Sequence, residues 1–436
     1  MSKQTQQLST RVLPDELKVL IKKINDYFDQ FKKIYIGRER VIDRVKYAML
    51  QKAHVLFFGV PGTSKTAIAG SIFDGITSST EFSLQMTAFM AEDAVFGSYN
   101  IKKMREEGIL EHNVEKMLPQ ANFANLDEFL DANPAVLRSL LSALNERKMV
   151  KGRQVLDIPL HVAYCSSNVD PYLFMRRNPQ AWAVFDRIAF IDRISYLDKA
   201  DDISEMVKRF QYRTSSTPKK TLDLSALNSI CDYVLLPPTL IQDQIIFMKY
   251  SEAAIDYRKK RKEKMQELDE QATSNSKGEF DIDYQGIIFQ DVSDRRICWA
   301  SHMMEVNAVL NGRIQVLPED MYAAHFVLGS SEIEKQIWYK IIDQKVEEIA
   351  DLKKNQLSDL QMQQLENLKN QFEDIRGNGH DLETRVNGVA TLVMQLNAIQ
   401  PENDTVKGTF DTLKTSVEEY KQKISDELLQ SKGLKA

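Results

Sequence analysis

The sequence predicts an α/β domain built on a parallel sheet with helices on both faces, followed by an all-helical domain and a C-terminal helical hairpin or bundle. Three observations carry this prediction. Short apolar segments alternate with helical ones between about residues 34 and 197, as in layered α/β domains. Helical patterns replace the strands between 198 and about 331. From 332 onwards the chain is almost wholly helical and polar.

These changes of pattern divide the 436 residues into four expected parts. An N-terminal helical segment covers 1–30, the α/β core 31–197, the helical domain 198–331 and the C-terminal extension 332–436. We expect an amphipathic helix in the first part, because its apolar residues repeat at helical spacing: Leu17, Leu20, Ile21, Ile24, Tyr27 and Phe28.

Two segments of the core have especially clear local signals. The apolar run "HVLFFG" (54–59) predicts the first strand. The later segment "NPAVLRSLLSALNERK" predicts a helix, because Asn133 is a good N-cap and Pro134 suits the first helical position.

The two helical parts contain three breaks. The segment "DEQATSNSKGEFDIDYQG" (269–286) predicts an exposed loop within the helical domain. In the C-terminal extension, "GNGH" (377–380) and "QPEND" (400–404) separate three expected helices with a narrow apolar stripe like a coiled-coil seam. We interpret this extension as a packing or oligomerisation surface, with a partner-docking arm as the alternative.

The composition is that of a soluble globular protein, with 43% hydrophobic and 27% charged residues. A net charge of −5 does not indicate a dedicated nucleic-acid binder. The three cysteines are widely spaced and form neither a metal-ligand pattern nor a disulfide framework. The first residues are polar, and no apolar run approaches the ~18 residues that span a bilayer. These features predict a cytoplasmic protein without a membrane span.

The first strand runs into "GVPGTSKT" (59–66), which fits the phosphate-binding pattern G-x-x-x-x-G-K-[ST] at all but one position. Phosphates need several backbone N–H groups aimed at one point, at the positive end of a helix dipole. Ser64 stands where the pattern has a glycine, and its Cβ restricts the backbone. The alternative is a Gly-Pro turn before an ordinary helix. The candidate nucleotide-binding residues are Gly59, Pro61, Gly62, Thr63, Ser64, Lys65 and Thr66.

Two carboxylates follow a second strand-like segment. Asp127 would hold Mg²⁺ together with the Thr66 hydroxyl, and Glu128 would polarise the attacking water as general base. A surface acidic turn before a helix is the alternative. Asn122 and Asn125 are polar for a strand that is buried on both faces.

Further candidates follow in the order that a nucleotide hydrolase needs. Asn168 ends another apolar strand, where its amide would orient the attacking water or touch the γ-phosphate, or only cap a turn. Arg187 would stabilise transition-state charge, unless it is an ordinary salt-bridged surface residue. Arg295 and Arg296 begin a helix of the second domain, from which a cation could reach back to the nucleotide.

With these motifs in this order, the chain resembles the AAA+ ATPases. Within them it looks like the MoxR group, and most like its regulatory ATPase variant A type. That group has a small residue in place of the last P-loop glycine, as at Ser64. The resemblance covers about residues 15–330 and includes "IYIGRERVID" (34–43), "MTAFMAEDAVFGSYNIKKMREEGIL" (86–110), "LDEFLDANPAVLRSLLSALNERKM" (126–149), "VSDRR" (292–296) and "NGRIQVLPEDMYAAHFVL" (311–328).

The resemblance implies a role for each candidate. The Walker A residues are Lys65 and Thr66, the Walker B residues Asp127 and Glu128, sensor 1 Asn168, the arginine finger Arg187 and sensor 2 Arg295, with Arg296 as its rival. Ile36 and Gly37 would border the adenine of ATP, which binds with Mg²⁺. The family pattern also implies a hexameric ring in which Arg187 enters the neighbour's site. An insert at 108–119 and a hairpin at 148–159 would face the ring axis.

The expected function is ATP-driven remodelling or chaperoning of a partner protein. Relatives in this group act on partner complexes, often on proteins with von Willebrand A domains, so a separate polypeptide would be the client. A nucleic-acid motor is one alternative, with "RKKRKEK" (258–264) as its basic patch, although such a patch on a helix is usually a solvated face. A weakly hydrolysing, nucleotide-gated scaffold is the other, and the polar strand around Asn125 favours it.

Overall fold

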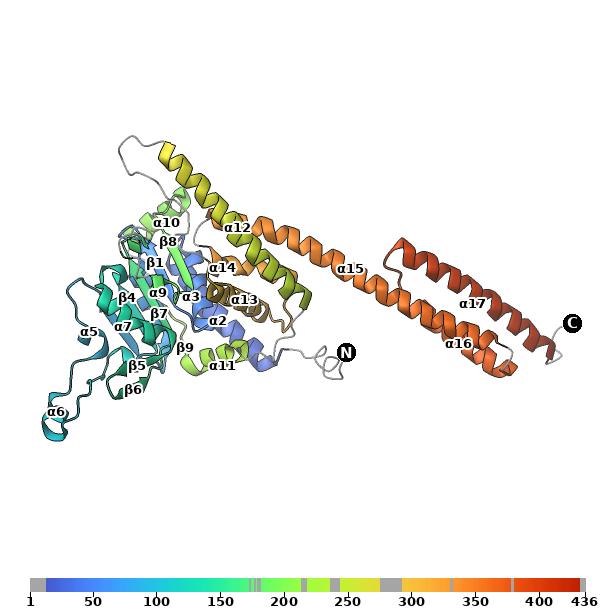
Figure 1. The fold of residues 1–436 in the computed structure, drawn as a ribbon, viewed down its shortest axis with the longest axis horizontal. Helices are drawn as coiled ribbons and strands as arrows, with labels where there is room; N and C mark the ends of the chain where they lie inside the picture. The colour runs from blue at the N-terminus through green and yellow to red at the C-terminus, as the bar shows by residue number, and fades with distance from the viewer. Residues whose placement is uncertain are drawn as a thin grey trace. The chain divides into compact units, whose positions relative to one another are not determined.

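The computed structural model describes residues 13–171, 174, 175, 178, 182–212, 218–235, 244–274, 292–329, 332–377 and 380–431 (Figure 1). Its internal contacts divide the chain into two units, Met1–Lys345 and Val346–Ala436.

The first unit is built around a five-stranded sheet, which confirms the predicted α/β fold class. In spatial order the strands are β3 (Glu81–Gln85), β4 (Phe123–Asp127), β7 (Val162–Ser167), β1 (Val55–Gly59) and β8 (Phe190–Ile194). All four neighbouring pairs are parallel. The carboxyl ends of β1, β4 and β7 therefore lie at one edge of the sheet, while the amino end of β8 lies at the opposite edge.

Helices cover this sheet and follow the predicted local signals. The side chain of Asn133 accepts hydrogen bonds from two backbone N–H groups of the first turn of α7, as expected of an N-cap. The N-terminal amphipathic helix extends to Ile34. Its buried face continues into the last turns, where Phe31 is as fully buried as Tyr27. The helices of this part are α2 (Asp15–Ile34), α3 (Glu39–Leu50), α4 (Lys65–Asp74), α5 (Asp93–Phe96), α6 (Ile101–Glu107), α7 (Pro134–Asn145) and α9 (Trp182–Phe185).

Short elements complete the α/β part. A two-stranded antiparallel hairpin, β5 (Lys148–Lys151) with β6 (Gln154–Asp157), occupies the segment where a hairpin was expected. Two residues of β2 (Ile76–Thr77) pair with β9 (Leu222–Asp223). The 3₁₀ helices are η1 (Leu118–Gln120), η2 (Phe129–Asp131) and η4 (Pro318–Ala324).

The described residues in the rest of the first unit are mostly helical, and α12 (Gln244–Ser274) extends into the segment where a loop was expected. Helix α12 continues to Ser274, so the expectation of a loop from 269 is wrong for its first six residues, which contain no Gly or Pro. The remainder of that segment lies outside the described residues. The helices are α10 (Ala200–Gln211), α11 (Leu224–Leu235), α12 (Gln244–Ser274), α13 (Asp294–Leu310) and α14 (His325–Leu328).

A fully buried arginine joins these helices to the sheet. The guanidinium of Arg44 in α3 pairs with Asp192 of β8 at 2.9 Å. It also donates to the carbonyl oxygens of Phe326 (2.9 Å) and Gly329 (2.8 Å), at the end of α14. A cation at the C-terminal end of a helix satisfies carbonyls that have no partner within the helix. The end of α14 is thereby fixed to β8.

The second unit contains the helices predicted for the C-terminal extension. Helix α15 (Glu332–Arg376) enters it from the first unit, α16 (Leu382–Asn397) begins after Asp381, whose side chain caps it, and α17 (Asp404–Ser431) follows. Their apolar stripes form one core: Leu365, Leu368, Phe372, Val389, Leu392, Leu396, Val406, Phe410, Leu413, Val417 and Ile424. Among the described residues, no helix is both long and apolar enough to cross a bilayer.

Three buried histidines make the stability of the first unit depend on pH. Burial lowers the pKa of His161 to about 4 and that of His325 to about 3, and it lowers the pKa of His54 well below its usual value. The unfolded chain takes up protons near pH ~6.5, where the folded protein does not, so stability is complete above that pH and falls below it. We expect the free energy of unfolding to drop by about 2 kcal/mol per histidine between pH 7.5 and 5. Denaturant unfolding at both pH values measures this, and equal stabilities would contradict it.

Candidate active site

The phosphate-binding loop connects the end of β1 to the start of α4. Gly59 ends β1 with a φ of 139°, and a Cβ there would lie 2.2 Å from the carbonyl oxygen of Ile194 in β8. Only glycine therefore fits at this position. Gly62 also has a positive φ, 78°, and it lies exposed at the turn together with Pro61.

Ser64 takes the conformation for which the phosphate-loop pattern has a glycine. Its φ of 64° and ψ of 24° are left-handed, a conformation that costs a residue with a Cβ about 1–2 kcal/mol. Its carbonyl oxygen accepts the first hydrogen bond of α4, from the N–H of Ile68 at 3.1 Å. The loop therefore keeps the geometry of the pattern despite the substitution.

Lys65 is buried, and its ammonium group has three acceptors. Its Nζ donates to the carbonyl oxygens of Gly59 (2.8 Å) and Val60 (2.9 Å) and to Oδ1 of Asn168 (2.8 Å). Burial lowers the pKa of Lys65, and the nearby charge of Glu128 opposes this shift. The three bonds hold the ammonium group at the loop, where phosphate oxygens could replace them.

The two predicted carboxylates lie at the same edge of the sheet. Asp127 ends β4, and its Oδ1 accepts a hydrogen bond from Oγ of Ser166 in β7 at 2.6 Å. Glu128 follows in a left-handed conformation, and its carboxylate accepts from the N–H of Asn168 at 3.2 Å and from the amide Nδ2 of Asn168. Asn168 thus contacts both Lys65 and Glu128. The structure brings these three predicted residues into one hydrogen-bonded group.

A magnesium ion fits this arrangement. Oδ1 of Asp127 has two hydrogen bonds, whereas its Oδ2 has no hydrogen-bond partner among the described residues. Thr66 is half-buried on the first turn of α4. Carboxylate and hydroxyl oxygens of this kind hold Mg²⁺ together with phosphate oxygens of the substrate.

Asn122, just before β4, and Asn125 within it have partners in distant segments of the chain, which sequence reasoning could not identify. Oδ1 of Asn122 accepts from the N–H and Oγ1 of Thr80, both at 3.0 Å, and its Nδ2 donates to Pro159. Asn125 is 4% exposed and hydrogen-bonds Glu81 of the neighbouring strand, although its Oδ1 has no partner in the described part of the chain. The strand keeps parallel register with β3 and β7 through Asn125, which lies opposite Ser83 and Tyr164.

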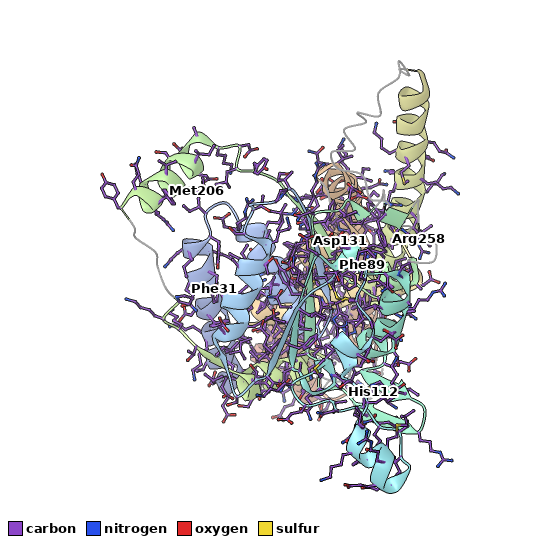
Figure 2. All side chains as sticks on the ribbon, turned by 90° about the vertical axis from the view of Figure 1, so that its left-hand side faces the viewer. Phe31, Phe89, His112, Asp131, Met206 and Arg258 are labelled. Atoms are coloured by element: carbon purple, nitrogen blue, oxygen red, sulfur yellow. The ribbon has the colours of Figure 1, made fainter. Side chains whose placement is uncertain are left out.

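A pocket of about 1090 Å³ opens beside the phosphate loop. Gly37, which lies next to the pocket in sequence, has a φ of 66°. A Cβ on this residue would lie 2.5 Å from Cδ2 of Leu197, so glycine allows the backbone to approach Leu197 closely. Figure 2 shows Met206 on α10, the helix that supplies part of the pocket wall. The lining residues are Ile34, Tyr35, Ile36, Arg38, Gly62, Thr63, Ser64, Tyr196, Leu197, Ile203, Met206, Arg209, Phe210 and Gln211.

Two of the predicted arginines lie away from the loop of their own chain. Arg187 precedes β8, whose Phe190 pairs with Val55 at the start of β1, whereas Gly59 pairs with Ile194 at the other end. Nη1 of Arg295 donates to Oδ2 of Asp186 at 2.7 Å, which places this side chain beside Arg187 at the amino edge of β8. The expectation that Arg295 reaches back to the nucleotide of its own chain is therefore not what this structure shows.

Arg296, the rival of Arg295, is buried between the two parts of the first unit. Its guanidinium donates to the carbonyl oxygens of Ile188 (2.9 Å), Ala189 (2.9 Å) and Val327 (2.7 Å). These bonds fix the start of α13 to the backbone that leads into β8. Arg296 thus positions α13, and with it the neighbouring Arg295.

Sequence reasoning missed two residues of the site. Ser166 holds Asp127, and the "SSN" run at a strand end was an available signal. The buried hydroxyl of Tyr164 donates to the carbonyl of Lys65 at 2.6 Å and ties β7 to α4. Because Tyr164 looks like an ordinary strand residue, no sequence signal could have found it.

Comparisons with known proteins agree with this geometry. A family model described as the MoxR domain of MoxR-vWA-beta-propeller ternary systems matches residues 22–227, and an AAA lid domain model matches 267–342. A crystal structure of a candidate ATPase from Cytophaga hutchinsonii covers 76% of this chain and 96% of its own, with a TM-score of 0.54 and 18% identity, which bears on the fold alone.

Relatives with similar sequences cover part of the chain. An uncharacterised protein of Methanocaldococcus jannaschii is 25% identical over 233 residues, which are 53% of this chain and 59% of that protein. The chaperone MoxR1 of Mycobacterium tuberculosis is 29% identical over 130 residues, 30% of this chain and 33% of its own length. The chain thus spans between a third and three fifths of these relatives. Residues 22–227 are thus similar to a MoxR domain and residues 267–342 to an AAA lid domain, which agrees with the loop, the parallel sheet and the helices described above.

Proposed function

We propose that this protein binds ATP with Mg²⁺, hydrolyses it and uses the turnover to remodel a partner protein. The observation that carries the proposal is the group formed by Lys65, Asn168 and Glu128 at the carboxyl ends of three adjacent strands. Transfer of the γ-phosphoryl group to water requires several groups close together: backbone N–H groups, a cation, a side-chain amide and a carboxylate.

The residues of the site divide the chemistry among them. The N–H groups of the loop bind the α- and β-phosphates, and Nζ of Lys65 reaches the β- and γ-phosphates. Mg²⁺, held by Thr66 and Asp127, would neutralise developing charge on the phosphate oxygens. Glu128 accepts a proton from the attacking water. Asn168 would exchange its bond with Lys65 for one with the γ-phosphate, which would leave Glu128 oriented toward the water.

We further propose a ring, in which Arg187 and Arg295 both serve the site of the neighbouring subunit. The support is their position beside Asp186 at the amino edge of β8, opposite the edge that carries the phosphate loop. A heterologous contact that repeats around a closed ring joins opposite faces of successive subunits. A hexamer, the four domain boundaries expected from the sequence, the regulatory ATPase variant A type and a cytoplasmic location stay predictions.

The proposed client is a protein with a von Willebrand A domain, a class that the description of the matching family model names. The insert around α6 projects from the core and is joined to the β5–β6 hairpin (Figures 1 and 2). The backbone N–H of His112 donates to Oε1 of Gln154 at 2.8 Å. Both elements expose apolar side chains that suit a protein client: Ile101, Met104, Ile109, Leu110, Val150 and Val155.

The nucleic-acid alternative loses part of its support. In the basic segment 258–264, Arg261 is buried and pairs with Glu334, Arg258 pairs with Asp294 (2.6 Å), and Lys264 pairs with Glu267. Three of the six basic residues of this segment are thus paired within the protein, which reduces the charge available for a phosphate backbone.

Phosphate release by the purified full chain tests the proposal. We expect turnover that requires both ATP and Mg²⁺ and that does not rise on addition of DNA. A chain that binds Mg·ATP but releases no phosphate would favour the nucleotide-gated scaffold, and one that binds no nucleotide would refute the proposal.

A further inference from the structure

The pocket beside the phosphate loop contains a second cation that the chemistry above does not use. Arg38 directly precedes α3 and lines this pocket together with Gly62, Thr63 and Ser64. Its backbone is anchored on both sides, because its N–H donates to the carbonyl of Tyr35 at 3.2 Å and its own carbonyl accepts from a residue in α3 at 3.0 Å. The backbone of Arg38 is therefore held at two points where the residue lines the pocket.

Among the described residues, the side chain of Arg38 has no hydrogen-bond acceptor. It is half-buried, and within the described part of the chain its guanidinium forms neither a hydrogen bond nor an ion pair. Arg209 lines the same pocket but donates to the carbonyl oxygen of Lys33 at 2.6 Å and pairs with Glu205 at 2.8 Å. A half-desolvated guanidinium with five N–H donors is most stable when an anion supplies the missing acceptors.

Electrostatics also favour an anion at this place. The charge of Arg38 lowers the pKa of Lys65, so the two cations repel each other across the site. Burial, the largest effect, also lowers the pKa of Arg38. An anion bound between the two side chains would relieve both effects, because it stabilises the charged form of each.

The position of Arg38 indicates which part of a nucleotide it would meet. The loop amides cradle the α- and β-phosphates and Lys65 reaches the β- and γ-phosphates, so no cation named so far contacts the α-phosphate. Arg38 lies two residues after Ile36, which lines the same pocket and is expected to border the base. The group between the base and the outer phosphates is the ribose with its α-phosphate.

We propose that Arg38 binds the α-phosphate of the nucleotide, within the same chain that supplies the phosphate loop. This inference rests on the proposed ATP site. It gives that site a second cation from its own chain, which Arg295 does not supply because α13 is bound at the opposite edge of the sheet.

Binding of three ligands to the full chain tests the assignment. ADP, AMP and adenosine are compared by competition with a fluorescent ATP analogue, for the wild type and for Arg38→Ala. Because a hydrogen bond to a charged group contributes about 1.5–3 kcal/mol, we expect roughly 10- to 100-fold weaker binding of ADP and AMP. Binding of adenosine should not change, and Arg38→Lys should restore part of the loss.

The control is Lys208→Ala, which removes the same charge from an exposed position on α10 outside the pocket lining. It should leave all three affinities unchanged, and thermal unfolding should show that Arg38→Ala is folded.

If Arg38→Ala binds ADP within twofold of the wild-type affinity, the assignment of Arg38 is wrong, while the proposed ATP site is unaffected. Equal losses of adenosine and AMP would instead assign Arg38 to the ribose or to pocket shape, and unchanged AMP with weaker ADP would assign it to the β-phosphate. A wild-type chain that binds no ADP would refute the proposed site itself.

Discussion

Glu128→Gln should lower the rate of ATP hydrolysis by about 10²–10⁴-fold and leave ATP binding intact, because an amide cannot accept the proton of the attacking water. Glutamine has the same shape, and its Oε1 can still accept the bond from Nδ2 of Asn168. The group around Lys65 is therefore expected to persist. Single-turnover phosphate release measures the chemical step, and equilibrium binding of labelled ATP measures affinity.

Asp131→Asn is the matched control for this substitution. Asp131 lies three residues further along, is exposed and carries the same charge (Figure 2). Its amide variant should hydrolyse ATP at nearly the wild-type rate. If Glu128→Gln also keeps the wild-type rate, Glu128 is not the general base, and the assignment of the site to hydrolysis loses its main support.

Arg187→Ala should lower kcat by about 10³–10⁵-fold, the range observed for arginine residues that stabilise transferring phosphoryl groups. Because Arg187 lies at the edge of the sheet opposite its own phosphate loop, its loss should act on the neighbour's site. Nucleotide binding to each subunit should remain. Steady-state turnover together with ATP affinity separates these two effects.

Mixing two inactive variants tests whether Arg187 acts between subunits. A subunit with Arg187→Ala retains an intact site, and a Glu128→Gln neighbour retains an intact Arg187. A 1:1 mixture should regain roughly a quarter of wild-type turnover if subunits assemble at random in a heterologous ring. Arg193→Ala, at an exposed position on β8, should keep normal turnover by itself. A mixture that stays inactive while the subunits co-assemble would argue against action in trans.

Much of the candidate site could be predicted from the sequence, because it depends on residues that are close together along the chain. The segment from Gly59 to Thr66 combines a strand end, glycines and a helix start within eight residues, so its geometry depends on local backbone preferences. Asp127 and Asn168 were identified for a related reason, since polar residues at the ends of apolar runs collect at one edge of a parallel sheet. The break between α15 and α16 was predictable because glycines interrupt helices wherever they occur.

Other parts of the site depend on contacts between distant segments. The hydrogen-bond partners of Asn122 are Thr80 and Pro159, about 40 positions away in either direction, so its polar character looked unsuitable for a buried strand. The choice between Arg295 and Arg296 was equally open, because both begin the same helix. Burial of Arg296 against the carbonyls before β8 distinguishes them.

The sequence by itself determined the fold class, the phosphate loop and the order of the candidate residues, because each of these follows from periodicity and from the chemistry of short segments. Only the tertiary structure decided which side chains meet: it joined Lys65 to Glu128 through Asn168, and it placed Arg295 beside Asp186. The physical reason is that α13 is held by buried hydrogen bonds to backbone carbonyls about 107 residues earlier in the chain. No local preference of the residues themselves specifies such a contact.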